Sequence, residues 1–276
     1  MESRPTYNVA DLAKIANDMR IDIIEQTHCA KSGHPGGSLS IVELLTYLYF
    51  VHMRVDPTNP KWDDRDRMVL SKGHAAPGLY AALAERGFFP REELVTLRKL
   101  DSHLQGHPSL KNTPGVDMTT GSLGQGISAA CGMAVAAKIA GKDYRTYTIV
   151  GDGESQEGQV WEACMFAAHR KLDNLCIILD WNGLQIDGAI EEVMNPTPYA
   201  EKLEAFGLHV ITIDAHDFDQ IAAALSEAES VKGKPTVIIA RSVKGKGVSF
   251  MENKASWHGS APNDDQYAAA LAELNK

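Results

Sequence analysis

The sequence predicts an α/β fold, a doubly wound and mostly parallel sheet with helices on both faces. Short apolar runs typical of strands alternate with segments of helical periodicity along the whole chain. In addition, the strand-like runs 147–150 and 175–179 are separated by a single helical stretch, the order found in a right-handed βαβ crossover. With neither an internal repeat nor a linker-like segment in 276 residues, we expect one domain, 1–276.

The N-terminal half is predicted to be mainly helical. Apolar residues recur at helical spacing from Val9 to about His28, and a second apolar helix is expected over 40–52. A short strand, 68–70, precedes two further helices, 77–86 and 92–100. A long loop over 101–120 then leads through a glycine-rich turn, 121–126, into a helix of small residues that reaches about Ala140.

In the C-terminal half the strands and helices alternate regularly. A helix is expected between the runs 147–150 and 175–179, and a loop with two prolines follows the second run. Further along we expect a helix over 199–206, a strand over 209–213, a helix over 218–230, a strand over 236–240 and a closing helix over 264–274.

Composition excludes several classes of partner. The net charge is −9 and no basic run occurs, so neither nucleic acid nor an anionic membrane is an expected ligand. The four cysteines are scattered, without a CxxC pair, as is typical of buried thiols in a reducing compartment. A signal-peptide pattern and an 18-residue apolar run are both lacking. We therefore expect a cytoplasmic protein.

Two polar turns follow the central strands. Asp152 lies in the turn Gly151-Asp152-Gly153, and Asn182 follows it by 30 residues, after the next strand. Because parallel strands end at one edge of the sheet, we expect these side chains to lie together. A carboxylate oxygen, an amide oxygen and a backbone carbonyl suit Mg²⁺ that keeps further oxygen ligands from a diphosphate. The glycines would let N–H groups approach phosphate, and the start of the following helix would add its dipole. The alternative is a βαβ unit with ordinary turns.

Four histidines lie in loops rich in glycine and proline. His34, His74, His107 and His258 all fall where predicted elements end. A single histidine of this kind more often caps or packs than catalyses. Four of them on loops that share one edge of the sheet favour a functional cluster, because imidazole binds phosphate or sugar oxygen and moves protons near neutral pH.

Several longer motifs carry a resemblance to a known family. The segments SGHPGGSLS, LSKGHAAPGLYA, GHP, TTGSLGQGIS, GDG with its Asn, and KGKGVSF followed by WHG occur in the order of the transketolase family. They extend from about residue 10 to about residue 262 and resemble its amino-terminal, diphosphate-binding module. The resemblance implies the thiamine diphosphate-binding fold, with thiamine diphosphate and Mg²⁺ as cofactors.

The resemblance also implies roles for the cofactor-binding residues. Asp152 and Asn182 would hold Mg²⁺ through their side chains, and Leu184 through its backbone carbonyl. Gly153 would donate a backbone N–H to the diphosphate. The remaining cofactor contacts would be His74 and His258 beside the diphosphate, and Gly121 and Leu123 on the aminopyrimidine side.

The same resemblance places the reacting groups. His34, His107 and His258 would line the channel for the sugar hydroxyls and for the carbonyl that is cleaved or joined. Glu157, and less clearly Glu162, resemble carboxylates at the family's subunit interface. The alternative for both is a solvated glutamate in the first turn of a helix, where the helix dipole favours it.

Lys72 and Lys244 could approach the diphosphate, although lysines in loops are usually solvated. The family often has Asp-Asp-Asn or Asp-Asn-Asn where this chain has Asp180-Trp181-Asn182, but the Asn ligand is retained.

The chain stops at Lys276, whereas transketolases continue for several hundred residues with a pyrimidine-binding module. We therefore expect the amino-terminal subunit of a split transketolase, which needs a carboxy-terminal partner subunit carrying that module. Together the two would transfer a two-carbon ketol unit from a ketose phosphate to an aldose phosphate. A heterotetramer with two copies of each chain is expected.

Two other functions stay open at this point. The chain could be the α-type subunit of another thiamine diphosphate enzyme, such as a 2-oxo acid dehydrogenase, which also carries the GDG and Asn pattern. It could also be an inactive subunit that binds the cofactor for assembly. The histidine loops favour the transketolase interpretation over the first, and the intact Asp152 and Asn182 argue against the second.

Overall fold

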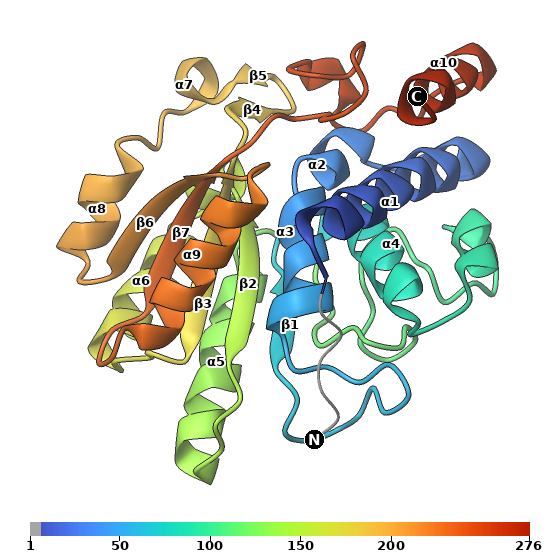
Figure 1. Cartoon of the computed structure of the whole chain (residues 1–276). Coiled ribbons are helices and arrows are strands. Elements are labelled where there is room, and N and C mark those ends of the chain that lie inside the picture. Colours follow the sequence, from blue (N-terminus) through green and yellow to red (C-terminus); the bar gives the residue numbers. More distant parts are fainter. Residues whose placement is uncertain (1–6) are drawn as a thin grey trace.

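Five parallel strands form the centre of the computed structural model, which describes residues 7–276 (Figure 1). Their order in the sheet is β1-β2-β3-β7-β6, and each neighbouring pair is parallel. All five strands therefore end at the same edge, as the predicted fold requires. The bounds are β1 Arg67–Leu70, β2 Thr146–Gly151, β3 Leu175–Trp181, β6 His209–Asp214 and β7 Thr236–Arg241.

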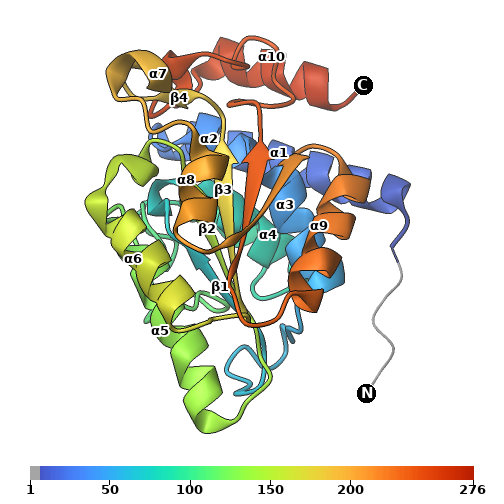
Figure 2. The same cartoon turned by 90° about the vertical axis from the view of Figure 1, so that its left-hand side faces the viewer.

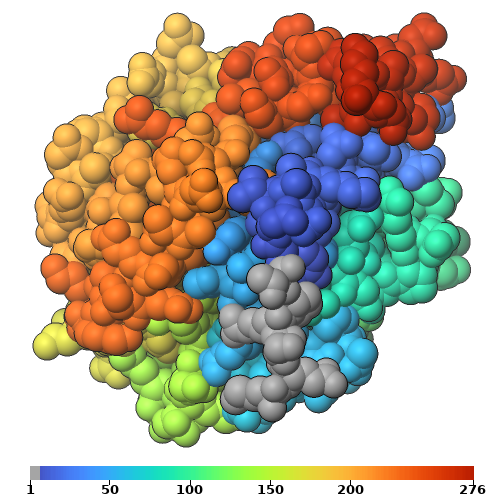
Figure 3. All heavy atoms as spheres, viewed as in Figure 1, coloured from blue at the N-terminus to red at the C-terminus, as the bar shows by residue number. Residues whose placement is uncertain are grey.

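Four helices cover one face of the sheet, and the larger of the two hydrophobic cores lies between them and the strands. The helices are α1 Val9–Ala30, α3 Val42–Tyr47, α4 Ala76–Arg86 and α9 Phe218–Ser230. Their apolar side chains pack with Ile149, Ile178 and Ile238 of the central strands. The last helix, α10 Asp264–Leu274, lies against α1, where Asn17 Nδ2 donates to the carbonyl of Leu274 at 2.8 Å. Figure 3 shows this C-terminal segment in red beside the blue α1.

The opposite face is covered by α5 Gln125–Ala140, α6 Gly158–His169 and α8 Tyr199–Ala205. Figure 2 shows α5 and α6 on one side of the strands and α1, α3 and α9 on the other. Ile177, Leu179 and Ile239 face this second core. They alternate along β3 and β7 with Ile178 and Ile238, which face the first core. Because both faces are buried, the strands read as continuous apolar runs.

Three predicted helices differ from the structure. The segment 92–100 forms only a 3-10 helix, Arg91–Thr96, which ends where Leu97 takes an extended ψ of 128° and Arg98 a left-handed φ of 60°. The helix expected over 40–52 is α3 followed by a π-helix, Leu48–His52. After Gly153 the chain first makes a 3-10 turn, Glu154–Gln156, so α6 begins only at Gly158. The helix start therefore does not directly follow the GDG turn.

Small elements stand above the carboxyl ends of the strands (Figure 1). They are α2 Pro35–Leu39, the hairpin β4 Leu184–Gln185 and β5 Gly188–Ala189, α7 Ile190–Val193, and the 3-10 helices Gly73–Ala75 and Ala255–Trp257. The predicted loop of His34 thus leads directly into a helix, α2, with Pro35 at its first position. Across residues 7–276, none of the helices combines the length and the apolar character that crossing a bilayer requires.

Candidate active site

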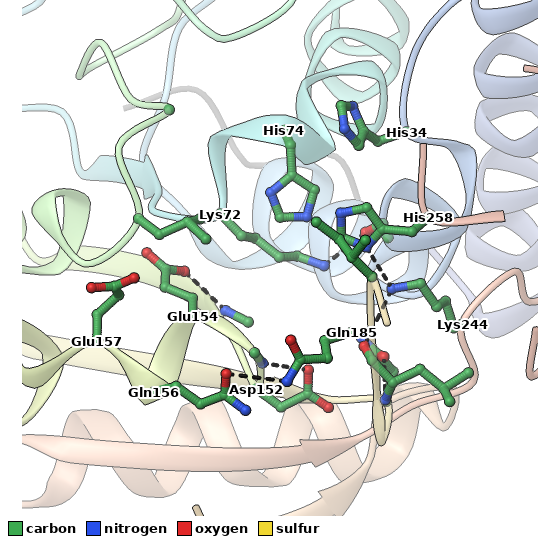
Figure 4. A pocket seen from close by; sticks show the side chains of 18 residues that line it. His34, Lys72, His74, Asp152, Glu154, Gln156, Glu157, Gln185, Lys244 and His258 are labelled. Carbon is green, nitrogen blue, oxygen red and sulfur yellow. Dashed lines mark hydrogen bonds between the residues drawn. The ribbon is translucent and has the colours of Figure 1, made fainter. Parts of the chain in front are cut away.

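A cavity of about 370 Å³ opens at the carboxyl ends of β1, β2, β3 and β7. In Figure 4 three histidines form one wall, Asp152, Gln156 and Gln185 lie opposite, and Lys72 and Lys244 reach between them. All the predicted site residues except His107 and Glu162 line this cavity. They are His34, His74, Gly121, Leu123, Asp152, Gly153, Glu157, Asn182, Leu184 and His258.

Asp152 is held at the end of β2 by the backbone. Its Oδ1 accepts from the N–H of Gly153 at 2.8 Å, and its Oδ2 accepts from the N–H of Gly183 at 2.6 Å. The second contact comes from the turn after β3, so the predicted meeting of the two turns is confirmed. Burial and then the charge of Asp180 raise the pKa of Asp152 to about 7. A cation at this carboxylate would relieve both effects.

Asn182 and Leu184 lie beside this carboxylate. Asn182 Nδ2 donates to Asp180 Oδ2 at 2.9 Å, which fixes the orientation of the amide, and its Oδ1 accepts from the N–H of Leu184 at 3.1 Å. The carbonyl of Leu184 accepts from Lys244 Nζ at 3.3 Å. The three predicted oxygen donors thus line one cavity, although hydrogen bonds within the protein occupy them here.

The donor set suits Mg²⁺ better than a soft metal. Within residues 7–276 no group of three or more His, Cys, Asp or Glu side chains is placed to hold a metal ion. One carboxylate, one amide oxygen and one carbonyl are hard donors, and Mg²⁺ commonly binds few protein oxygens together with phosphate oxygens. These residues therefore fit the Mg²⁺ diphosphate that the resemblance implies.

Asp180 joins four segments behind the predicted metal ligands. It is fully buried, and its Oδ2 accepts from Lys72 Nζ at 2.7 Å and from Ser40 Oγ at 2.9 Å. Ser242 Oγ donates to the other oxygen. Burial alone would raise the pKa of Asp180, but the Lys72 ammonium and these hydrogen bonds hold it below its usual value. The expectation that Lys72 is solvated is wrong, since only 2% of its side chain is exposed.

Lys244 is buried as well, so the same expectation fails for it. Its Nζ contacts the carbonyl of Leu184 and, at 3.2 Å, His258 Nδ1. Burial and then the charge of Lys72 lower its pKa to about 8. In the described part of the chain no ion pair joins Lys244 to a carboxylate. A buried ammonium that lacks a paired anion and faces a cavity suits an anionic ligand such as a diphosphate.

Three histidines from distant loops meet on one wall. The ring centroids of His34, His74 and His258 lie 5.0–5.4 Å apart. Burial, followed by neighbouring positive charge, lowers the pKa of His34 to about 4 and that of His258 to about 3, and it holds the pKa of His74 well below its usual value. All three rings are neutral at pH 7. Because Lys244 donates to His258 Nδ1, the His258 proton lies on Nε2.

His34 has a free hydrogen-bonding position. Its Nδ1 is buried and has no protein partner among the described residues. Since buried polar atoms are nearly always satisfied, the ring of His34 keeps the capacity for one further hydrogen bond.

His107 lies apart from this wall. Its side chain is exposed and packs behind Gly121, where a Cβ would lie 3.1 Å from the imidazole. Gly121 takes φ 144°, a conformation that favours glycine. His107 thus shapes the edge of the cavity, and its predicted role toward substrate stays a prediction.

Sequence reasoning missed Glu154. This buried carboxylate lines the cavity and accepts from Ser71 Oγ at 2.5 Å and from the N–H groups of Gly124 and Gly151 at 2.9 and 3.0 Å. It therefore fixes the glycine turn before α5 to the ends of β1 and β2. Only its position next to the GDG turn could have pointed to it.

Glu157 lies at the rim of the cavity, where it is exposed beside Gly124. Glu162 is exposed on α6 and does not line the cavity. Trp181 points away from the site, with its ring 5.5 Å from that of Tyr199 and with the Arg241 guanidinium 5.0 Å from its centroid. The retained Asn182 lines the cavity as predicted.

Comparison with known proteins decides between the transketolase family and another family of thiamine diphosphate enzymes. The sequence profile described as "Transketolase, thiamine diphosphate binding domain" matches residues 12–274. The chain belongs to the transketolase family. The predicted family, the transferase class and thiamine diphosphate as cofactor are thereby confirmed.

Two relatives of this transketolase chain have nearly its own length. It is 49% identical over 266 residues to the 6-deoxy-6-sulfo-D-fructose transketolase subunit SqwG of Clostridium sp. (strain MSTE9), covering 96% of this chain and 97% of that one. It is 43% identical over 254 residues to one of the subunits of the apulose-4-phosphate transketolase of Phocaeicola vulgatus, covering 92% of this chain and 90% of that one.

The solved transketolases share the fold but are longer. The crystal structure of the transketolase from Campylobacter jejuni superimposes with a TM-score of 0.92 at 35% identity. The match covers 98% of this chain and 43% of that one. The predicted fold, a mostly parallel sheet of the thiamine diphosphate-binding type, is therefore confirmed.

Proposed function

We propose that this chain is the diphosphate-binding subunit of a two-subunit transketolase and forms a single domain. With its partner it transfers a two-carbon ketol unit from a ketose phosphate to an aldose phosphate. The observation that carries the proposal is one cavity where Asp152, Asn182 and the Leu184 carbonyl lie opposite three neutral histidines. The match to two separate transketolase subunits over nearly their full length supports the division into two chains.

The chain's own residues bind one end of the cofactor. Asp152, Asn182 and the Leu184 carbonyl would hold Mg²⁺, and the Gly153 N–H would donate to the diphosphate. Lys244 lies within the same cavity and adds a positive charge beside this end. When bound, thiamine diphosphate supplies the carbanion chemistry by which a ketol unit leaves one sugar and joins another.

The histidines suit the sugar. A neutral imidazole carries one N–H donor and one nitrogen acceptor, groups that match the hydroxyl groups of a sugar. His258 presents Nε2–H while Lys244 holds its Nδ1, and the buried Nδ1 of His34 still needs a partner. We assign to these rings the orientation of the substrate and short proton transfers at its oxygens.

A surface beside the site suits the partner subunit. We call it the α5–α6 face and define it by Gly132, Ile139, Gly158, Met165 and Phe166. The three large side chains are 79%, 55% and 45% exposed, and a Cβ at either glycine would meet nothing within 4 Å. Apolar and small residues in the open are typical of a surface that another chain covers.

Glu157 and Leu123 lie at the rim of the cavity near the start of both helices, so a partner on the α5–α6 face would also close the site. We propose that the partner contributes the pyrimidine-binding module and that two copies of each chain form a heterotetramer. The four cysteines carry no disulfide, in keeping with the proposed cytoplasmic location.

Reconstitution tests the proposal. The purified chain receives Mg²⁺, thiamine diphosphate, xylulose 5-phosphate and ribose 5-phosphate, and ketol transfer is measured before and after the candidate partner is added. We expect activity only in the mixture, and none when Asp152→Ala replaces the wild-type chain. Full activity of the isolated chain would contradict the two-subunit proposal.

The same mixture distinguishes the other functions. Release of CO₂ from pyruvate without ketol transfer would favour a 2-oxo acid dehydrogenase. Tight cofactor binding without turnover of any ketose would favour an inactive assembly role. A panel of ketose phosphates and a sulfonated ketose, the substrate type in the name of the Clostridium relative, would identify the donor.

A further inference from the structure

Three charged or polar side chains lie together behind the loop that carries Lys244. Arg20 of α1 and His216 of the β6–α9 connection both contact Glu43 of α3. The Arg20 guanidinium binds one oxygen of Glu43, and His216 Nδ1 lies 3.0 Å from the other. Only 9%, 8% and 11% of the Arg20, Glu43 and His216 side chains is exposed. None of them lines the active-site cavity.

The proton arrangement of this triad follows from its contacts. His216 Nε2 accepts from the backbone N–H of Val243 at 2.9 Å. Its ring proton therefore lies on Nδ1, which donates to Glu43, and Glu43 accepts from Arg20 on its other side. The hydrogen bonds thus converge on Glu43, which accepts from His216 on one side and from Arg20 on the other.

Both ends of the segment 243–247 are held by this triad. His216 accepts from Val243 at one end, and Arg20 Nε donates to the carbonyl of Lys246 at 3.2 Å at the other. Gly247 packs directly on the Arg20 side chain, since a Cβ there would lie 2.7 Å from Arg20 Cδ. Gly247 also takes φ 92°, which favours glycine at this close approach.

Lys244 lies between the two held points. Its backbone is held on either side by the triad and at its own carbonyl by the N–H of Asn253 at 2.9 Å. Its side chain enters the active-site cavity, where Nζ reaches the Leu184 carbonyl and His258 Nδ1. A lysine side chain has many rotamers, so a fixed backbone decides where its ammonium can lie.

We propose that Arg20, Glu43 and His216 are positioning residues, which act on cofactor binding through Lys244 by fixing the backbone of residues 243–247. The inference rests on the proposed function, because Lys244 is taken to face the diphosphate. Neither His216 nor Glu43 touches the cofactor or the substrate in this arrangement.

The central test is a double-mutant cycle between His216 and Lys244. The measured quantity is the dissociation constant of thiamine diphosphate at saturating Mg²⁺, in the complex with the partner subunit. His216→Phe keeps the ring but loses both hydrogen bonds, so affinity should fall about tenfold, the scale set by one or two such bonds. Lys244→Met should lower affinity as well. If His216 acts through Lys244, the double variant should bind within about twofold of Lys244→Met alone.

Two further variants separate positioning from general damage. His216→Gln can accept from Val243 and donate to Glu43, so it should bind within about twofold of wild type. His209→Phe is the matched control, because His209 also pairs with a glutamate, Glu227, but lies at the start of β6, away from the loop. Hydrogen exchange at the Val243 amide provides a readout without cofactor: it should be faster in His216→Phe and unchanged in His216→Gln and His209→Phe.

The possible failures are distinguishable. If wild type binds the cofactor but His216→Phe binds it equally well, or if the two losses add in full, the positioning proposal is overturned and the proposed function stands. If the wild-type complex does not bind thiamine diphosphate, the proposed function fails, and the positioning proposal fails with it. Faster exchange in the control His209→Phe would show general loosening and would also overturn the proposal.

Discussion

Replacing Lys72 by Met is expected to destabilise the protein strongly, because Asp180 would remain buried without its cation. Lys72 Nζ lies 2.7 Å from Asp180 Oδ2, and the two side chains are 2% and 0% exposed. Ser40, Ser242 and Asn182 would still donate hydrogen bonds to Asp180, so its carboxylate would lose its charge partner but not all its contacts. Breaking a buried pair from one side costs about 3–5 kcal/mol. In proteins of this size range each kcal/mol lowers the melting temperature by about 2–4 °C, so we expect a fall of roughly 6–20 °C.

The assay is thermal and urea unfolding of the isolated chain without cofactor. Lys72→Met, Asp180→Asn and the double variant complete a cycle that isolates the pair. Each single variant leaves one buried charge unpaired, whereas the double variant leaves none. The double variant should therefore be more stable than the sum of the single losses predicts. A melting temperature of Lys72→Met within about 2 °C of wild type, or fully additive losses in the double variant, would refute the reasoning.

Three more predictions concern binding, catalysis and pH. Asp152→Ala should abolish Mg²⁺-dependent binding of thiamine diphosphate, measured by calorimetry in the complex; unchanged affinity would remove the metal assignment. His34→Ala and His107→Ala should each lower ketol transfer by about 10²–10⁴-fold and leave cofactor affinity within a few-fold; wild-type turnover would return them to packing roles. Burial alone would raise the pKa of Glu43, but the His216 hydrogen bond and Arg20 lower it from 4.5 to about 2. The ionised Glu43 carboxylate therefore adds up to about 3 kcal/mol to the free energy of unfolding above pH 4.5. This contribution is lost as the pH falls toward 2. Between pH 3 and 6, the free energy of unfolding from urea titrations should depend less on pH in Glu43→Gln than in wild type. The same pH dependence in both proteins would contradict this.

Local sequence patterns predicted the frame of the site. The GDG turn and Asn182 each follow a strand, and parallel pairing of β2 with β3 then brings Asp152 and the 182–184 turn together. The loops of His34, His74 and His258 likewise converge, since each lies at the same edge of the sheet. These outcomes need only the order of the elements and the direction of the strands.

Contacts between distant segments were beyond such patterns. Lys72 and Lys244 look like ordinary loop lysines. Nothing near them in the sequence indicates that they bind Asp180 and the Leu184 carbonyl in the interior. The failure at 92–100 has another cause. Its apolar spacing suits a helix, but the chain leaves helical backbone angles at Leu97 and is left-handed at Arg98, and neither residue type signals such a break.

Trp181 gives this site an optical consequence. It is the last residue of β3, its ring packs with Tyr199 and Arg241, and the next residue along the chain is Asn182. Indole emission depends on nearby charge and on rigidity, so an ion held by Asn182 would act on Trp181 through the backbone next to it, although the ring itself points away from the cavity. The position at which this chain departs from the common Asp-Asp-Asn and Asp-Asn-Asn patterns therefore supplies a fluorophore one residue from a proposed metal ligand, so binding can be followed by light without an attached dye.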